Sequence, residues 1–215
     1  MIRVILCDDH ALIRRGIRDT LADAPDMRVV GEAGDYTELR GLMRKEACDV
    51  LVLDINMPGR NGLDVLHALK DEGSTVKVLV VSMYPEDQYA IRALKNGAYG
   101  YVNKGDDPQA IVSAVRTVSQ GRKYVTPEIA QMLVDSLTSP DNVEHPHHKL
   151  SDRELQTLVM IASGKRLSDI AEELVLSPKT VSVYRARVLE KLGLANNSEL
   201  TVYAIRHGLV GDVQP

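Results

Sequence analysis

Acidic side chains, a serine and a lysine stand where short apolar runs of the sequence end. Asp8 and Asp9 follow the first run, and Asp54 closes the third. Ser82 and Lys104 follow the fourth and fifth runs. Carboxylates a few ångströms apart repel one another by roughly 4 kcal/mol per charged pair at an effective dielectric near 20. If these residues meet, the cluster therefore needs a cation or a proton.

Magnesium suits such a cluster because it prefers oxygen ligands, keeps several waters and leaves room for a phosphoryl group. Asp54 is then predicted to be a nucleophile that attacks phosphorus, while Lys104 neutralises developing charge and Ser82 donates to a phosphoryl oxygen. A single acid such as Asp8 could equally cap a helix and pair with Lys104. The joint placement of all these residues at strand ends favours a site.

The elements that must position these residues alternate in type through residue 125. Apolar, β-branched runs occupy residues 4–6, 28–33, 50–53, 76–81 and 99–102. Between them, apolar residues recur at helical spacing, as at Ile13, Ile17 and Leu21. This alternation predicts a parallel sheet with helices on both faces, whose strands end at a common edge.

The pattern changes after residue 125. Thr126-Pro127-Glu128 predicts the start of a helix, and the polar, proline-bearing residues 139–149 predict a linker with solvated histidines. From residue 150 onward the pattern predicts helices only, opened by a capping box at Ser151 and Glu154. We therefore expect a first domain over residues 1–125, a helix and linker over 126–148, and a second domain over 149–211.

Residues 167–192 predict two helices joined by a short turn, which is helix-turn-helix geometry. Val181 and Val188 fall on a core face of the second helix. The opposite face carries small, basic and apolar residues, which suits a major groove, where apolar groups meet thymine methyls and basic groups find phosphates. These residues are Lys179, Ser182, Val183, Ala186 and Arg187.

Charge supports this interpretation only locally. The chain carries a formal charge of −4, and none of its three segments is basic overall. The predicted second helix, however, has four basic residues against Glu190, a local excess of three positive charges. The four are Lys179, Arg185, Arg187 and Lys191. A solvated amphipathic helix or a protein-binding module would show similar charges.

Both halves of the sequence resemble two-component response regulators of the NarL/FixJ subfamily. The likeness to a receiver domain lies in residues 7–9, in residues 54–59 with Gly62, in Ser82, and in residues 100–104. The likeness to a LuxR-type DNA-binding domain lies in residues 150–154, 170–174, 176–181 and 191–193. Asp8-Asp9-His10 is similar to the variant usual in one subfamily.

The resemblance implies a flavodoxin-like (β/α)5 receiver with parallel strand order 2-1-3-4-5, followed by a small all-α domain. It implies phosphorylation of Asp54 by a sensor histidine kinase. Mg²⁺, or Mn²⁺, would be held by Asp9, Asp54 and the Asn56 carbonyl, with Asp8 supporting through water. Ser82 and Tyr101 would be switch residues. One departure is Gly105, which stands where many receivers have proline, so the loop that holds Lys104 is expected to be looser.

For the second domain, the resemblance implies sequence-specific binding to double-stranded DNA with paired half-sites, and homodimerisation on activation. It places Ser182, Val183 and Ala186 toward bases and Lys179, Arg185 and Arg187 toward the backbone, with Thr180 on the same surface. Dimer contacts are expected in the last helix, at Leu200, Val202 and Tyr203. The protein would be a transcription regulator and not an enzyme, apart from self-phosphorylation and slow self-dephosphorylation at Asp54.

Other classes of protein fit less well. Two cysteines make neither a zinc site nor a disulfide framework, and no run of about 18 apolar residues predicts a membrane span. A cytoplasmic protein without a membrane partner is expected. An aspartate-nucleophile phosphohydrolase needs a second acid where Asn56 stands. A flavin-binding module needs glycine or hydroxyl residues where Asp8 and Asp9 stand. A vestigial pocket with DNA binding alone stays open, although the intact acidic set argues against it.

Overall fold

The computed structural model describes residues 1–57, 59–83, 86–138 and 146–210, with backbone only at 86–88 and 135–138. The chain divides into two compact units, residues 1–138 and 139–215, each of which is described by itself. Seven residues of the expected linker, 139–145, lie outside the described residues, as does residue 211 of the expected second domain.

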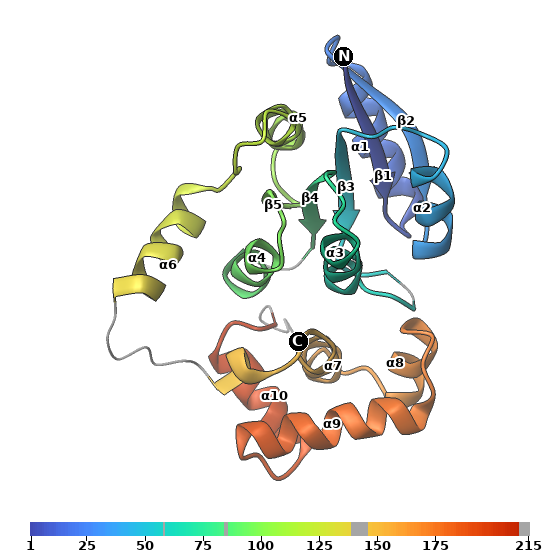
Figure 1. Ribbon diagram of the computed structural model, residues 1–215. Coiled ribbons are helices and arrows are strands. Elements are labelled where there is room, and N and C mark those ends of the chain that lie inside the picture. The colour runs from blue at the N-terminus through green and yellow to red at the C-terminus, as the bar shows by residue number, and fades with distance from the viewer. Residues whose placement is uncertain (58, 84–85, 139–145, 211–215) are drawn as a thin grey trace. The chain divides into compact units, whose positions relative to one another are not determined.

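The first unit is built on a five-stranded parallel sheet in the order β2-β1-β3-β4-β5, which confirms the predicted order (Figure 1). Cys7 pairs with Leu53, and Ser82 pairs with Asn103. This register brings the carboxyl ends of β1, β3, β4 and β5 to one edge of the sheet. The strands are β1 (Ile2–Cys7), β2 (Met27–Ala33), β3 (Val50–Asp54), β4 (Lys77–Ser82) and β5 (Gly100–Asn103).

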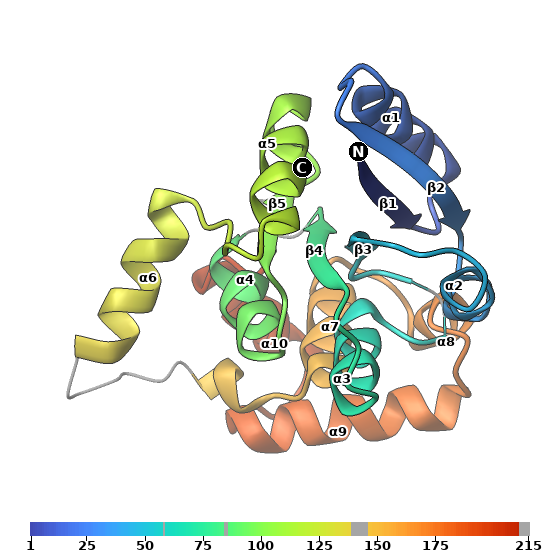
Figure 2. The same cartoon turned by 45° about the horizontal axis from the view of Figure 1, so that its top comes forward.

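Helices cover both faces of the sheet. Helices α1 (Ala11–Ala22) and α5 (Pro108–Ser119) lie on one face, where Ile17, Leu21 and Val115 join the core. Figure 2 shows the other helices of this layer arrangement on the opposite face. These are α2 (Tyr36–Met43), α3 (Gly62–Asp71) and α4 (Glu86–Lys95). Because β3 is covered on both faces, all five of its residues are buried, as its continuous apolar run predicted.

A sixth helix, α6 (Pro127–Thr138), begins at the proline that predicted it. It packs against α4, and Ile129 is fully buried. The side chains of residues 135–138, at the end of this helix, lie outside the described residues. This helix therefore belongs to the first compact unit.

The second unit is helical throughout its described part. The capping box of Ser151 and Glu154 opens α7, Ser177 caps α9, and Gly193 ends α9 in the left-handed region at φ 66°. Its elements are the 3-10 helix η1 (Pro146–Lys149), α7 (Asp152–Ala162), α8 (Leu167–Glu173), α9 (Pro178–Leu192) and α10 (Asn197–Arg206). Among the helices described in either unit, none is long and apolar enough to cross a membrane.

His147 does not behave as a solvated linker residue, so that prediction was wrong for this position. Its side chain is buried, and Nδ1 lies 3.0 Å from the hydroxyl oxygen of Tyr203 in α10. The ring also packs against His207 with centroids 5.5 Å apart. The end of the expected linker is thus attached to α10 through contacts between residues more than 50 positions apart, which local composition could not reveal.

Gly62 controls how the chain leaves β3. Its N–H donates to the carbonyl of Ile55 at 2.9 Å, and it opens α3 directly after the N-cap residue Asn61. A Cβ at this position would lie 2.2 Å from the carbonyl oxygen of Asp54 and 2.9 Å from Cα of Ile55. The loop that carries Asp54 therefore runs in backbone contact with the start of α3, and only glycine fits there.

Gly62→Ala is expected to destabilise the first unit by about 1–3 kcal/mol or more, because the obstructing atoms belong to backbone and cannot rotate away. Urea unfolding measures the change. Gly16→Ala is the control, because Gly16 is exposed in α1 and a Cβ added there would meet no atom within 4 Å. That substitution should stabilise the helix by roughly 0.5–1 kcal/mol. Equal, small effects of the two changes would contradict the steric argument.

Candidate functional sites

Three buried charges meet at the carboxyl edge of the sheet. Lys104 Nζ lies 2.8 Å from Asp8 Oδ2 and 2.7 Å from Asp54 Oδ2, and all three side chains are almost completely buried. Asp54 ends β3, whereas Asp8 and Lys104 directly follow β1 and β5. One ammonium between two carboxylates leaves a net negative charge in a place that water scarcely reaches.

Burial and the neighbouring Asp8 both disfavour the ionised form of Asp54. Burial raises the pKa of Asp54 to about 6, against the lowering effect of Lys104 and with a further raising contribution from Asp8. The Asn56 N–H donates to Asp54 Oδ1 at 3.1 Å. In this environment a second cation would stabilise the ionised carboxylate.

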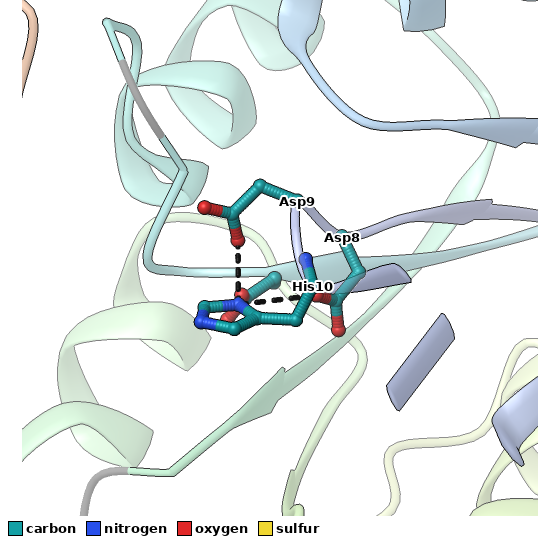
Figure 3. A group of neighbouring side chains, drawn as sticks. Asp8, Asp9 and His10 are labelled. Atoms are coloured by element: carbon teal, nitrogen blue, oxygen red, sulfur yellow. Dashed lines mark hydrogen bonds and ion pairs between the residues drawn. The ribbon is translucent and has the colours of Figure 1, made fainter. Parts of the chain in front are cut away.

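Asp9 and His10 complete the mouth of the pocket. Asp9 Oδ1 lies 2.7 Å from His10 Nδ1, and Figure 3 shows the imidazole turned toward the carboxylates of Asp8 and Asp9. One ligand atom from each of Asp8, Asp9, His10 and Asp54 lies within 4.8 Å of the others. Carboxylate oxygens are the ligands that a hard divalent ion such as Mg²⁺ prefers, so these three carboxylates suit such an ion.

The predicted switch residues are both inside the protein. Ser82 and Tyr101 are fully buried, and the Ser82 carbonyl accepts a hydrogen bond from the Lys104 N–H at 2.8 Å. Ser82 is thereby fixed beside the lysine that serves Asp54. Any switch through these residues must reorganise buried contacts, since Tyr101 has no exposed ring to bury.

The loop after Lys104 is held by side chains in the absence of the proline. Asn103 Oδ1 accepts from the Gly105 N–H at 2.8 Å, and Asp106 Oδ2 accepts from the Asn103 N–H at 3.2 Å. Asp107 then caps α5 by accepting from the Gln109 N–H at 2.9 Å. These polar contacts restrain a segment that sequence reasoning expected to be looser.

Sequence reasoning missed two residues of this site. The guanidinium of Arg14 donates to the backbone carbonyl of Asp8, and its Nε lies 3.4 Å from Glu32 Oε2. His10 approaches Asp9 as described above. The spacing of four residues between His10 and Arg14 could have indicated that both side chains lie on the same side of α1 and near the pocket.

In the second unit, α9 exposes the predicted DNA-binding face. Val181 and Val188 are fully buried on its inner side. On the outer side Val183 is 42% exposed. The other exposed members of this face are Lys179, Ser182, Ala186 and Arg187.

Other residues of α9 are already engaged within the unit. Arg185 Nε donates to Asn197 Oδ1 at 2.5 Å, and Thr180 forms part of the helix cap with Ser177. Lys191 Nζ pairs with Glu154 at 2.6 Å. Burial raises the pKa of Glu154, but Lys191 and the Ser151 N–H outweigh it and hold that pKa below its usual range. Lys191 therefore adds less to the outer charge than the sequence count suggested.

Helix α10 carries the three residues that were expected at dimer contacts, and they differ in exposure. Leu200 is fully buried and presents no surface to a second copy, whereas Val202 is 48% exposed. Tyr203 is half-buried beside His147. A shallow groove of about 350 Å³ runs along this helix and is lined by Leu194, Ser198, Glu199, Val202, Tyr203, Arg206 and His207.

Comparison with known families identifies both domains of the chain. A model described as the response regulator receiver domain matches residues 4–116, and one described as bacterial regulatory proteins of the luxR family matches residues 148–204. The chain is 41% identical over 209 residues to response regulator UvrY of Escherichia coli K12, covering 97% of this chain and 96% of that one. It is 40% identical over 210 residues to response regulator GacA of Pseudomonas aeruginosa, covering 98% of each.

Solved structures give the same result. RcsB from Salmonella enterica serovar Typhimurium, bound to promoter rprA in the presence of the phosphomimetic BeF3−, matches with a TM-score of 0.67 at 26% identity, covering 94% of this chain and 97% of that one. The response regulator ChrA of a heme-sensing two-component system matches with a TM-score of 0.51 at 31% identity, covering 97% and 98%.

Asp54→Asn is expected to stabilise the metal-free first unit at pH 8 by about 1–3 kcal/mol. The pKa of Asp54 is about 6 in the folded chain against an ordinary value of 3.8. Between pH 6 and 4 the folded chain therefore holds a proton on Asp54 that the unfolded chain lacks. The charged Asp54 is therefore destabilising above pH 6, and the benefit of Asn should disappear near pH 4. Urea unfolding in chelator across this range gives the measurement.

Asp49→Asn is the control with the opposite sign. The neighbouring Arg3 holds the pKa of Asp49 below its usual value, so its charge is stabilising. Removing that charge should weaken the unit at neutral pH and lose its effect in acid. A gain from Asp54→Asn that did not change with pH would contradict the assignment of the cost to ionisation.

Proposed function

Because the chain belongs to the response regulators that join a receiver domain to a LuxR-type DNA-binding domain, we propose that Asp54 takes a phosphoryl group with Mg²⁺ and thereby controls dimerisation and DNA binding. The observation that carries this proposal is the buried arrangement of Asp8, Lys104 and Asp54 at the carboxyl edge of the sheet. Regulation of transcription is the family function in which this chemistry takes part.

The phosphoryl group would come from a phosphohistidine of a sensor kinase. An Asp54 carboxylate oxygen attacks phosphorus, the phosphorus–nitrogen bond breaks, and an acyl phosphate forms. Lys104 already lies 2.7 Å from Asp54 and supplies positive charge to the transferred oxygens. Ser82, fixed beside it, is the proposed donor to one of those oxygens.

A divalent ion would be held by the acidic cluster around Asp54. Asp9, Asp54 and the Asn56 carbonyl are the proposed ligands, with Asp8 acting through water. When bound, Mg²⁺ supplies charge that draws the phosphoryl oxygens toward the nucleophile. The three clustered carboxylates support this role because their mutual repulsion falls when a cation is present.

Phosphorylation would switch the domain through buried contacts. Because the carboxylate charge of Asp54 is lost in the acyl bond, the group adds a net charge of about −1 at neutral pH, together with strong acceptor oxygens. Lys104, which now bridges two carboxylates, and Ser82 would re-form their contacts around it, and Tyr101 would follow. Moving a population from mostly off to mostly on requires roughly 5.5 kcal/mol of differential stabilisation, which such a group and dimerisation can share.

DNA would be read by the outer face of α9. Ser182, Val183 and Ala186 are proposed to meet base edges, while Lys179 and Arg187 meet phosphates. Thr180 and Arg185 are weaker candidates because both hold contacts inside the unit. In support, the similar RcsB structure is bound to a promoter in the presence of a phosphomimetic.

Dimerisation would bring two such units to paired half-sites through α10, with Val202 and Tyr203 as the proposed contacts. The domain limits in this proposal are 1–125 for the receiver, 126–148 for the connecting segment and 149–211 for the DNA-binding domain. A sensor histidine kinase as partner and a cytoplasmic location belong to the same proposal.

Incubation with acetyl phosphate and Mg²⁺ should add one phosphoryl group to the chain, because Asp54 is positioned as the nucleophile. Intact-mass measurement gives the result directly. Asp54→Asn and a chelator-treated sample should both show no gain. Addition at an undiminished level to Asp54→Asn would refute the assignment of the nucleophile, and no addition to the native chain would refute the mechanism in its simplest form.

Arg187→Gln should weaken binding to specific and nonspecific DNA alike and reduce the slope of log affinity against log salt by about 1, as loss of one phosphate contact requires. Arg15→Gln removes the same charge from an exposed position on α1 and should leave the slope unchanged. Fluorescence anisotropy with labelled duplexes at several salt concentrations distinguishes the two. Equal slopes for native protein and Arg187→Gln would exclude a phosphate contact by this residue.

A further inference from the structure

Two lysines share one tyrosine ring at the amino-terminal edge of the sheet. Lys77 opens β4 and Tyr99 directly precedes β5, whereas Lys123 follows α5. Nζ of Lys77 lies 4.7 Å from the centroid of the Tyr99 ring, and Nζ of Lys123 lies 4.4 Å from it. In the part of the chain that the structure describes, neither lysine forms an ion pair with a carboxylate. Two ammonium groups therefore lie against one ring without an acid to neutralise them.

The amine of Lys123 is held in place at its end. Although the residue as a whole is exposed, Nζ donates a hydrogen bond to the carbonyl of Ala98. Burial of this amine lowers the pKa of Lys123, Tyr99 acts against that effect, and the charge of Lys77 adds to it. A larger share of Lys123 is therefore neutral at pH 8 than of an ordinary lysine. A lysine that is desolvated or lies beside another cation is a typical amine nucleophile.

A cavity lies beside the other lysine. Lys77 and Tyr99 line this cavity, whose volume is about 150 Å³, and Lys70 and Ser74 belong to the same wall. The space exceeds that of several water molecules, so a small anion can enter it. Ammonium and hydroxyl groups in the wall are donors that bind a phosphate. Because both lysine nitrogens are close to one ring, an anion held at Lys77 comes within reach of Lys123.

We propose that Lys123 is an acylation site, at which its amine takes the acyl group of a small acyl phosphate while Lys77 binds the phosphate of that donor. The neutral amine attacks the carbonyl carbon, and the bond from that carbon to the bridging oxygen breaks. Inorganic phosphate leaves with the electron pair, and the nitrogen gives one proton to solvent as the amide forms. Lys77 stabilises the negative charge of the leaving phosphate. The product is a neutral amide, so one positive charge beside Tyr99 is lost.

The experiment incubates the full chain with acetyl phosphate and a chelator at pH 8, then unfolds it and blocks the remaining amines with deuterated acetic anhydride. Mass spectrometry of peptides gives the fraction acetylated by acetyl phosphate at each lysine. Lys123 should react at least about threefold faster than the exposed Lys45, since one partly exposed charge contact contributes about that factor. In urea the two lysines should react alike, because the arrangement around Tyr99 is lost.

Variants of Lys77 test its part in the reaction. Lys77→Gln should reduce acetylation of Lys123 to the rate of Lys45, because the charge that binds the donor is gone. Lys77→Arg should keep most of the native rate, since arginine retains a positive charge. Lys45, read in the same molecules, is the matched control for each variant.

Equal rates at Lys123 and Lys45 in the native chain would overturn the inference. A faster rate at Lys123 that survives in urea, or that Lys77→Gln leaves unchanged, would also overturn it. A phosphoryl group at Asp54 differs in mass and position from an acetyl group at Lys123, so the two reactions are measured separately. The inference can therefore fail while the proposed function stands.

Discussion

Two buried carboxylates that share one ammonium form the interaction on which the first unit depends. Removing two acids and a lysine from water is costly, and deleting the lysine would leave two uncompensated negative charges. The arrangement exists only because Asp8, Asp54 and Lys104 come from neighbouring or nearby parallel strands that end together. The position of Asp54 also depends on Gly62, because the absence of a side chain there lets the Asp54 loop lie against the start of α3.

Much of this could be predicted from the sequence because strands, helices and strand-end residues are local features. The order of the strands, the helices over the apolar stripes and the convergence of acids at one edge all follow from short patterns. Ring and side-chain orientations do not. The approach of His10 to Asp9, and the attachment of His147 to Tyr203, depend on contacts that no local pattern encodes.

Backbone conformation also escaped prediction at one place. Val175, in the turn before α9, has φ 53°, a region that costs a residue with a Cβ roughly 1–2 kcal/mol. Gly193 performs the same function at the end of α9 without that cost. The N–H of Leu176 bonds to the carbonyl of Ala171 at 2.8 Å, so helix-end hydrogen bonds and the packing of α8 on α9 hold the valine there.

In the proposed mechanism, the charge of α9 is the reason that dimerisation can control DNA binding. Lys191 is paired with Glu154 and Arg185 is held by Asn197, so few basic side chains of this helix are left for phosphates. With few phosphate contacts, one copy gains little electrostatic affinity, and this affinity falls further with salt. In a dimer, once one DNA-binding unit is bound, the second binds its half-site intramolecularly. The overall affinity therefore rises without any additional contact per unit. Under the proposed mechanism, control of dimerisation is control of DNA occupancy, and a charge added at Asp54 suffices if it changes which surfaces can pair.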